Sequence, residues 1–394
     1  MREAEQETEK NGNLLEIHNA CIRKNLAFVT FRLPRHAEPV TYIQTSSHGF
    51  EWESITDLSM KKGFILAPFD TRNGKKYIRI KPDIIIEGKQ LSKKKVDEIN
   101  ALPGNHLPEW DMAEPVITER DEYLDQVQHI KDSISTGYFQ KAVLSRIHMV
   151  KGNYMYHITR IFRDVCESHP NAFVYIFKSD DHFWLGASPE PLLRLSDGVV
   201  STVSLAGTRY YTEENMDLNN WTMKEVLEQE YVTRYIHDNL RDYGIRDYRI
   251  TSPYVKKAGD LVHLRTDFTF RSEQLKGRLW KFLEALHPTP AVAGQPKEDA
   301  ISFIKQLEPH DREYYSGFLG PVHSDENMDL FVNLRCMKIT PEYLSLYIGG
   351  GITLESDPGD EWDETGLKAE SLMSIIHTIS ELKQSARALQ STYR

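Results

Sequence analysis

Cysteine is scarce in this sequence, which has only Cys21, Cys166 and Cys336 among its 394 residues. The number is odd and no Cys-x-x-Cys spacing occurs, so the pattern does not indicate a disulfide framework. Long apolar runs are also absent, because no stretch approaches the roughly 20 residues needed to cross a membrane. The first ten residues lack the apolar core of a signal peptide. These absences predict a protein of the reducing cytoplasm with no membrane partner.

An excess of positive charge is missing as well. The chain has 58 acidic and 48 basic residues, and its formal net charge is −10. This balance argues against a general nucleic-acid-binding protein, although a local cationic pocket can still bind an anionic substrate. The contents of 40% hydrophobic and 27% charged residues are those of a globular protein with enough length for a large core.

The pattern of apolar residues predicts strands and helices without regular βαβ alternation. This order favours an α+β fold with a large, mostly antiparallel sheet system. Residues 1–12 are polar and are expected to form a disordered tail. Residues 13–115 are expected to form the N-terminal part of the fold, with a short helix, strands at 26–33, 64–68 and 77–87, and a polar connection over 88–110.

Farther along the chain the pattern predicts longer elements. Thr118 is expected to cap a helix that ends near Ser135, and strands are expected at 139–150 and 329–340. Lys141 lies in the first of these strands among apolar neighbours. It is either an edge residue that reaches water or a desolvated lysine with a lowered pKa. Arg335 falls in the middle of the second strand and needs a partner there, for which a carboxylate is the natural choice.

Two predicted helices, over 219–241 and 360–388, each carry a Glu-x-x-Glu pair. The pairs are Glu225/Glu228 and Glu361/Glu364. Either pair alone is typical of a solvated helix face. If the two helices face each other, their carboxylates repel unless a cation or a proton lies between them. Oxygen ligands without a His or Cys cluster suit Mg²⁺.

The second of these helices follows a predicted strand that runs into three consecutive glycines, Gly349–Gly351. Glycines allow close approach of a ligand to the backbone and its N–H groups. Lys368 is predicted to share a helix face with Glu361 and Glu364. The alternative is a glycine hairpin followed by a surface helix with an ordinary Glu364–Lys368 pair. Elsewhere, Glu190 is fixed between two prolines, which favours a catalytic carboxylate over a solvent-exposed turn residue.

Several stretches together resemble the chorismate-utilising enzymes, and they occur in the expected order over residues 116–380. The stretches are Lys141-Ala-Val-Leu-Ser-Arg146, Leu185-Gly-Ala-Ser-Pro-Glu190, Leu205-Ala-Gly-Thr-Arg209, His287-Pro-Thr-Pro-Ala291, Leu307-Glu-Pro-His-Asp-Arg312, Asn333-Leu-Arg-Cys336, Gly349-Gly-Gly-Ile352 and Glu361-Trp-Asp-Glu-Thr-Gly-Leu-Lys368.

The resemblance implies a fold and a reaction. It implies a single α+β domain of two packed, mostly antiparallel sheets with helices outside and the active site in the cleft between the halves. Residues 116–388 would be the chorismate-binding catalytic region. The expected reaction is the Mg²⁺-dependent isomerisation of chorismate to isochorismate, in which water adds at C2 and the C4 hydroxyl leaves. Its product would supply menaquinone or siderophore synthesis.

The resemblance also implies roles for individual residues. Lys141 is expected to be the general base that activates water, and Glu190 the general acid, which must be protonated and therefore have a raised pKa. Glu228 and Glu364 are expected to bind Mg²⁺, with Glu225 and Glu361 supporting them. The expected substrate-binding residues are Ala206, Gly207, Thr208, His287, Tyr315, Arg335, Gly349, Gly351 and Lys368.

Lys141 also bears on the choice between related reactions. Aminating relatives, the anthranilate and aminodeoxychorismate synthases, usually carry glutamine at this position, so the lysine favours water as the nucleophile. Salicylate synthase shares the lysine and then eliminates pyruvate, and it remains an alternative. A monomer that acts on chorismate without a glutaminase subunit is expected.

Overall fold

The computed structural model describes residues 14–58, 62–88, 93–259, 261–324 and 326–392. The predicted tail over residues 1–12 lies outside these ranges. Residues 14–23 are helical. The other helices are α2 (Lys93–Ala101), α3 (Arg120–Ser135), α4 (Ile158–Ser168), α5 (Met223–Asp242), α6 (Leu279–Leu286), α7 (Lys297–Leu307) and α8 (Pro358–Thr392). None of the helices in the described ranges has an apolar stretch long enough to span a membrane.

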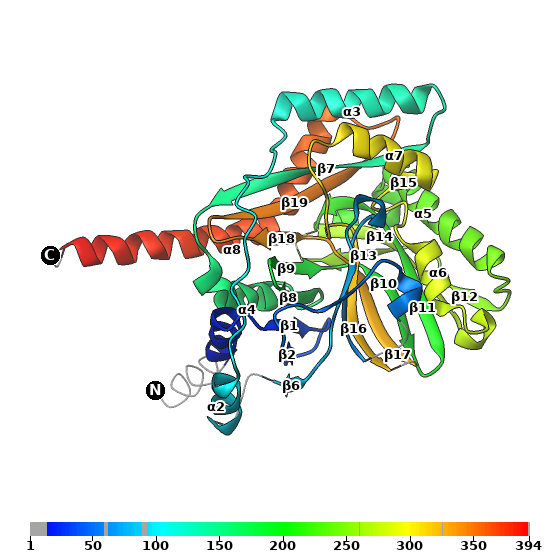
Figure 1. The fold of residues 1–394 in the computed structure, drawn as a ribbon. Helices are drawn as coiled ribbons and strands as arrows, with labels where there is room; N and C mark the ends of the chain where they lie inside the picture. The colour runs from blue at the N-terminus through cyan, green and yellow to red at the C-terminus, as the bar shows by residue number, and fades with distance from the viewer. Residues whose placement is uncertain (1–13, 59–61, 89–92, 260, 325, 393–394) are drawn as a thin grey trace.

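The described strands form two large antiparallel sheets (Figure 1). The first sheet has the order β15 (Gly294–Gln295), β7 (Lys141–Lys151), β19 (Tyr343–Ile352), β18 (Cys336–Ile339), β9 (His182–Ser188), β8 (Phe173–Ser179), β1 (Ala27–Arg32), β2 (Val40–Gln44) and β6 (Ile84–Glu87). The second has the order β12 (Tyr248–Ile250), β14 (Leu261–Arg271), β11 (Val199–Tyr210), β10 (Pro191–Ser196), β17 (Asn327–Val332), β16 (Phe318–Ser324), β4 (Gly63–Ala67), β5 (Tyr77–Ile80) and β3 (Phe50–Trp52), and β13 (Tyr254–Ala258) also pairs with β14.

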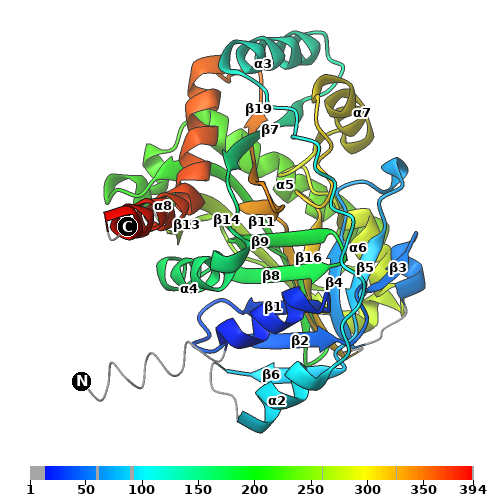
Figure 2. The ribbon, with the colours of Figure 1, turned by 60° about the vertical axis from the view of Figure 1, so that its left-hand side comes forward.

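The two sheets pack face to face, and helices cover their outer faces. A core of apolar side chains from both sheets lies between them, where the rings of Phe173 on β8 and Phe331 on β17 stack with centroids 4.2 Å apart. A second core joins the first sheet to the N-terminal helix, α4 and α8, and a third joins the second sheet to α5 and α6 (Figure 2). This α+β architecture confirms the predicted fold class.

Two predicted strands were wrong in the same way, because the chain leaves one sheet and enters the other within each of them. The predicted strand over 77–87 is β5 in the second sheet and β6 in the first, and Pro82, which has no N–H donor, lies at the break. The predicted strand over 329–340 is β17 in the second sheet and β18 in the first. Arg335 lies in this crossover with φ of 49°, and it is not in mid-strand.

Smaller corrections concern helix boundaries. The polar stretch over 88–110 contains helix α2, which buries Val96 and Ile99, so it is more than a connection. Helix α3 begins at Arg120, and Glu119, not Thr118, is its N-cap residue. Helix α5 begins at Met223, where Thr222 and Glu225 form a capping box.

Candidate active site

A pocket of about 90 Å³ lies where β11, β19, α5 and α8 meet the Pro189–Glu190 turn. It brings together predicted site residues that are up to 178 positions apart in the sequence. The predicted residues that line it are Glu190, Ala206, Gly207, Thr208, Glu228, Tyr315, Arg335, Gly349, Gly351 and Lys368.

The glycines of this pocket belong to strand β19, which continues through them to Ile352. One edge of β19 pairs with β7 along this stretch, with Gly349 opposite Ser145. On the other edge the pairing with β18 ends at Tyr347, so the glycine backbone there borders the pocket. A Cβ atom on Gly351 would overlap the Glu228 carboxylate and lie 2.8 Å from Lys141 Cε. Glycine is therefore needed for the charged side chains to approach the strand.

Lys141 is fully buried at the start of β7, beside the pocket. Its Nζ donates a hydrogen bond to Glu228 Oε1 at 2.9 Å. The side chain therefore does not reach water, and its burial agrees with the desolvated alternative. Burial alone would raise the pKa of Glu228, but the ammonium groups of Lys141, Lys368 and Lys224 together outweigh it and lower that pKa.

Glu190 presents a carboxyl group in a different electrostatic state. It follows β9 in the Pro189–Pro191 turn and is 5% exposed. Burial raises its pKa to about 8, although the neighbouring cations Lys141 and Arg265 oppose that shift. The carboxyl group therefore holds its proton at neutral pH, as the role of general acid requires.

The condition set for the two Glu-x-x-Glu helices is met, because α5 and α8 lie close together beside the glycine strand, and lysines lie among their carboxylates. Lys224 on α5 donates to Glu361 on α8 at 2.6 Å, and Lys368 donates to Glu364 at 2.7 Å and to the Gly349 carbonyl at 3.0 Å. Lysine ammonium groups thus supply the charge compensation that facing carboxylates need.

The chemistry of these carboxylates fits a divalent cation. Glu361 is fully buried, and its Oε2 has no hydrogen-bond partner within the described part of the chain. Burial and the adjacent Glu364 raise the pKa of Glu361 to about 7. Within the described ranges no three acidic, His or Cys side chains already surround one point suitable for a metal ion. A metal would therefore replace lysine ammonium groups, of which Lys224 is partly exposed.

Glu225 does not join this group, contrary to the prediction. Its carboxylate accepts a hydrogen bond from Arg209 Nε at 2.7 Å and from the backbone N–H of Thr222 at 3.0 Å. It therefore fixes the start of α5. Its Cβ would lie 3.0 Å from a Cβ on Gly207, which has φ of 70°, so only glycine fits at that turn.

Arg335 and a residue that the sequence did not single out lie together at one side of the pocket. Arg335 has no carboxylate partner within the described chain, and its Nη2 lies 3.5 Å from Nε2 of His263. His263 Nδ1 donates to the Gly207 carbonyl at 2.9 Å, and burial lowers the pKa of His263 to about 3. The neutral ring therefore presents an acceptor toward Arg335. The available signal was a histidine flanked by Val262 and Leu264 at the start of β14.

His287 is not among the residues that line the pocket, which corrects the prediction for this residue. Its ring packs against Phe318, and its Nε2 lies 3.4 Å from the Pro68 carbonyl. These contacts pack His287 against the core of the second sheet, so its role there is structural.

A buried polar network behind β7 was also missed. Glu308 accepts hydrogen bonds from the backbone N–H of Ser145 at 2.7 Å and from Arg312 Nη2 at 2.5 Å. Arg312 in turn donates to the Val143 carbonyl at 2.5 Å. These bonds fix the segment of β7 that carries Lys141 and pairs with the glycines, so the network positions the site without entering it.

Two isochorismate synthases are among the known proteins of similar sequence. Isochorismate synthase MenF of Bacillus subtilis is 26% identical over 265 residues, which cover 66% of this chain and 56% of the relative. Isochorismate synthase EntC of Escherichia coli is 29% identical over 267 residues, which cover 66% of this chain and 68% of the relative. The chain thus spans little more than half the length of the first of these relatives.

Solved structures of similar fold extend over most of the chain. A 2,3-dihydroxybenzoate-specific isochorismate synthase from Bacillus anthracis has a TM-score of 0.72 at 23% identity, and the match covers 90% of this chain and 97% of that one. The menaquinone-specific isochorismate synthase from Escherichia coli has a TM-score of 0.73 at 20% identity, covering 91% and 90%.

The family profile matches the region that contains every site residue discussed above. The profile described as chorismate binding enzyme matches residues 73–377, which is more than half of the chain. The order of the motifs, the paired antiparallel sheets and this match agree with one another. The chain belongs to the chorismate-binding enzyme family.

Proposed function

We propose that this protein is an isomerase that converts chorismate to isochorismate with Mg²⁺. The observation that carries the proposal is the buried Lys141 in contact with Glu228, in the same site as a protonated Glu190. One reaction that needs both a lysine base and a carboxylic acid is the addition of water at C2 with loss of the C4 hydroxyl.

The cationic and glycine-lined part of the pocket suits a dicarboxylate substrate. Arg335 and Lys368 supply positive charge. The phenol of Tyr315 lies against the glycine strand, with its oxygen 2.8 Å from the point that a Cβ on Gly349 would occupy. A guanidinium can bind a carboxylate through two parallel hydrogen bonds. In this proposal these groups hold the enolpyruvyl carboxylate and orient the ring.

Glu228, Glu361 and Glu364 are the residues that would hold Mg²⁺. Bound there, the ion would neutralise the ring carboxylate and keep it in place. Lys141 would act as the neutral amine, after release of its ammonium proton to solvent. Its Nζ would take a proton from the attacking water, and Glu190 would give its proton to the departing hydroxyl. The step leaves Lys141 protonated and Glu190 ionised. The starting states return when a proton passes from Lys141 through solvent to Glu190, or when the reaction runs in reverse.

The direct test is to incubate the protein with chorismate and Mg²⁺ and to separate the products. Isochorismate in a reversible mixture with chorismate is expected. Salicylate as the main early product at neutral pH would favour the pyruvate-eliminating reaction instead. Anthranilate or aminodeoxychorismate formed with ammonia would contradict the role given to Lys141.

Mg²⁺ dependence gives a prediction about the acidic cluster. Glu361→Gln is expected to weaken Mg²⁺ binding by about tenfold or more, because it removes charge from a site of hard oxygen ligands. Titration calorimetry with Mg²⁺ measures this without reference to turnover. Glu230→Gln is the matched control, because Glu230 pairs with Arg234 on the exposed side of α5. Full wild-type activity in excess EDTA, or equal Mg²⁺ affinity in both variants, would contradict the prediction.

The raised pKa of Glu190 predicts an alkaline limb in the pH profile. The acid form of Glu190 is present below a pH of about 8 and is lost as the pH rises through that value. We expect kcat/KM to fall about tenfold per pH unit above this point, since kcat/KM reports the ionisation of the free enzyme. Initial rates from pH 6 to 10 would measure the limb. A constant kcat/KM from pH 8 to 10 would show that another group is the acid.

We further propose that the protein acts in the cytoplasm as a monomer without a glutaminase subunit. Water needs no partner protein to generate it, whereas ammonia does. The isochorismate would be used for menaquinone or for a siderophore. Analytical ultracentrifugation of the purified chain tests the monomer, and a stable dimer at micromolar concentration would refute it.

A further inference from the structure

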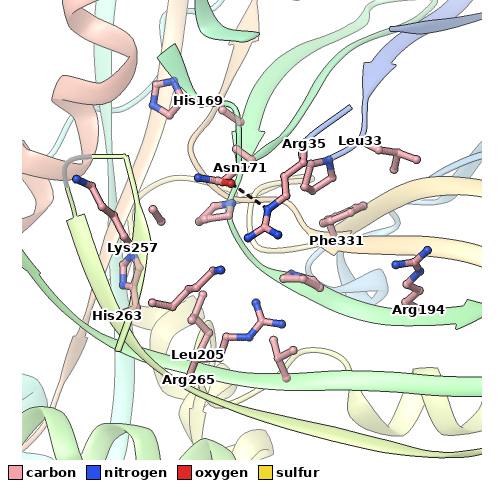
Figure 3. Close-up of a pocket in the computed structure, with 18 of the residues that line it drawn as sticks. Leu33, Arg35, His169, Asn171, Arg194, Leu205, Lys257, His263, Arg265 and Phe331 are labelled. Atoms are coloured by element: carbon pink, nitrogen blue, oxygen red, sulfur yellow. Dashed lines mark hydrogen bonds between the residues drawn. The ribbon is translucent and has the colours of Figure 1, made fainter. Parts of the chain in front are cut away.

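A larger cavity of about 430 Å³ adjoins the active-site pocket (Figure 3). Its walls come from the segments at 33–36 and 169–172 and from strands β10, β11, β13, β14 and β17. We call it the outer chamber. Four residues line both the chamber and the pocket, so the two spaces share a boundary: Pro189, Leu205, His263 and Arg335.

The outer chamber carries uncompensated positive charge in a protein whose net charge is −10. Arg265 is paired with Asp267 at 2.5 Å and Arg194 with Asp329 at 3.1 Å. The remaining cations in the chamber form no direct ion pair with a carboxylate of the described residues, although Asp267 is near enough to Lys256 to act on its pKa. The cationic residues that border it, through side chain or backbone, are Arg35, Arg194, Lys256, Lys257, Arg265 and Arg335.

Lys256 lies near two other cations of the chamber, Arg35 and Arg265. Burial lowers its pKa, and the like charges of Arg35 and Arg265 lower it further, while the Asp267 carboxylate opposes the shift. Figure 3 shows Arg35 and Arg265 extending into the same space from separate segments, with Arg35 held by Asn171 through a hydrogen bond of 3.3 Å. Asp267 offsets part of this repulsion, and the cations that remain in excess form a site that an anion stabilises.

The neighbouring Lys257 differs although it is also on β13. Its ammonium lies over the ring of Tyr211, 3.1 Å from the centroid, and Figure 3 shows the side chain pointing away from the chamber. Successive residues of a strand face opposite sides, which explains the difference. Lys256 and Lys257 therefore provide two lysines of equal charge, of which only one faces the chamber.

Arg335 connects the two spaces. It lines both, and its guanidinium lies beside the neutral ring of His263 at their common boundary. An anion in the chamber is thus already next to the arginine that is expected to bind a substrate carboxylate. Charged walls of one sign in a recess concentrate ions of the opposite sign and raise association rates.

We propose that the outer chamber captures the dianionic substrate through Arg35, Lys256 and Arg265 and passes it to Arg335 at the boundary with the active site. The inference rests on the proposed function for the identity of the substrate. It adds a second binding step and assigns these three residues to association, with no part in the chemical step.

The test measures association of chorismate with a protein in which turnover is suppressed by Glu190→Gln. The fluorescence of Trp221 is the reporter, because its ring lies 3.2 Å from the point that a Cβ on the pocket residue Gly207 would occupy. Adding Lys256→Gln is expected to slow association about fivefold at 20 mM NaCl and less than twofold at 300 mM, since salt screens steering. Adding Lys257→Gln is the control and should change either rate less than twofold.

Equal association rates for the Lys256→Gln and Lys257→Gln proteins at low salt would overturn the proposal. Failure of the proposed function would show separately, as an absence of isochorismate among the products of the wild-type protein. In that case malonate replaces chorismate as the anion that probes the chamber. Malonate binding that Lys256→Gln weakens about fivefold and Lys257→Gln leaves unchanged would support an anion site, and equal binding by all three proteins would overturn it.

Discussion

Replacing Glu190 with glutamine is expected to reduce kcat about a thousandfold while the affinity for chorismate changes little. General acid catalysis contributes roughly 10²- to 10⁴-fold, and an amide cannot donate the proton that the leaving hydroxyl needs. Because burial raises the pKa of Glu190 to about 8, the native side chain is neutral at pH 7. Glutamine copies its shape and its charge, so the substitution removes the proton and little else.

The same reasoning predicts the stability of this variant. No charge is lost from the buried site, so we expect the free energy of unfolding to change by less than about 1 kcal/mol. Urea unfolding and steady-state kinetics on the same preparation measure both quantities. Glu230→Gln, at the exposed side of α5, is the control and should retain wild-type activity. A kcat within a few-fold of the wild type for Glu190→Gln would place the acid elsewhere.

Lys141→Gln is expected to abolish isochorismate formation and also to destabilise the fold. Glutamine cannot accept a proton from water, so the base is lost. The substitution also leaves the Glu228 carboxylate without the ammonium that lies 2.9 Å away. Breaking a buried ion pair by removing one partner costs about 3–5 kcal/mol. Product analysis and urea unfolding measure the two effects.

The double variant Lys141→Gln/Glu228→Gln separates stability from catalysis. It removes the unpaired carboxylate, so it should recover part of the unfolding free energy that the single variant loses. It should remain inactive, because the base is still missing. Recovery of activity together with stability would show that Lys141 serves only as a partner for Glu228. Anthranilate formed by the wild type with ammonia would refute water as the selected nucleophile.

Sequence alone determined the fold class of this protein and named ten of the residues that line the pocket. Alternation of apolar residues identified strand β19, because side-chain direction in a strand has a period of two. The spacing of Glu361, Glu364 and Lys368 placed them on one helix face before any neighbour was known. Local rules of this kind need no tertiary information, and the motifs around Lys141 and Glu190 then supplied the family.

Only the tertiary structure decided what each of these side chains touches. Glu225 and Glu228 are one helical turn apart, yet one caps α5 beside Arg209 and the other contacts Lys141. The crossovers at Pro82 and Arg335 were hidden, because a strand reads the same whether its partner lies in one sheet or the other. Burial and through-space charge set the pKa of Glu190 and the positive charge of the outer chamber. Both depend on residues that are distant in sequence, and packing of the two sheets brings those residues together.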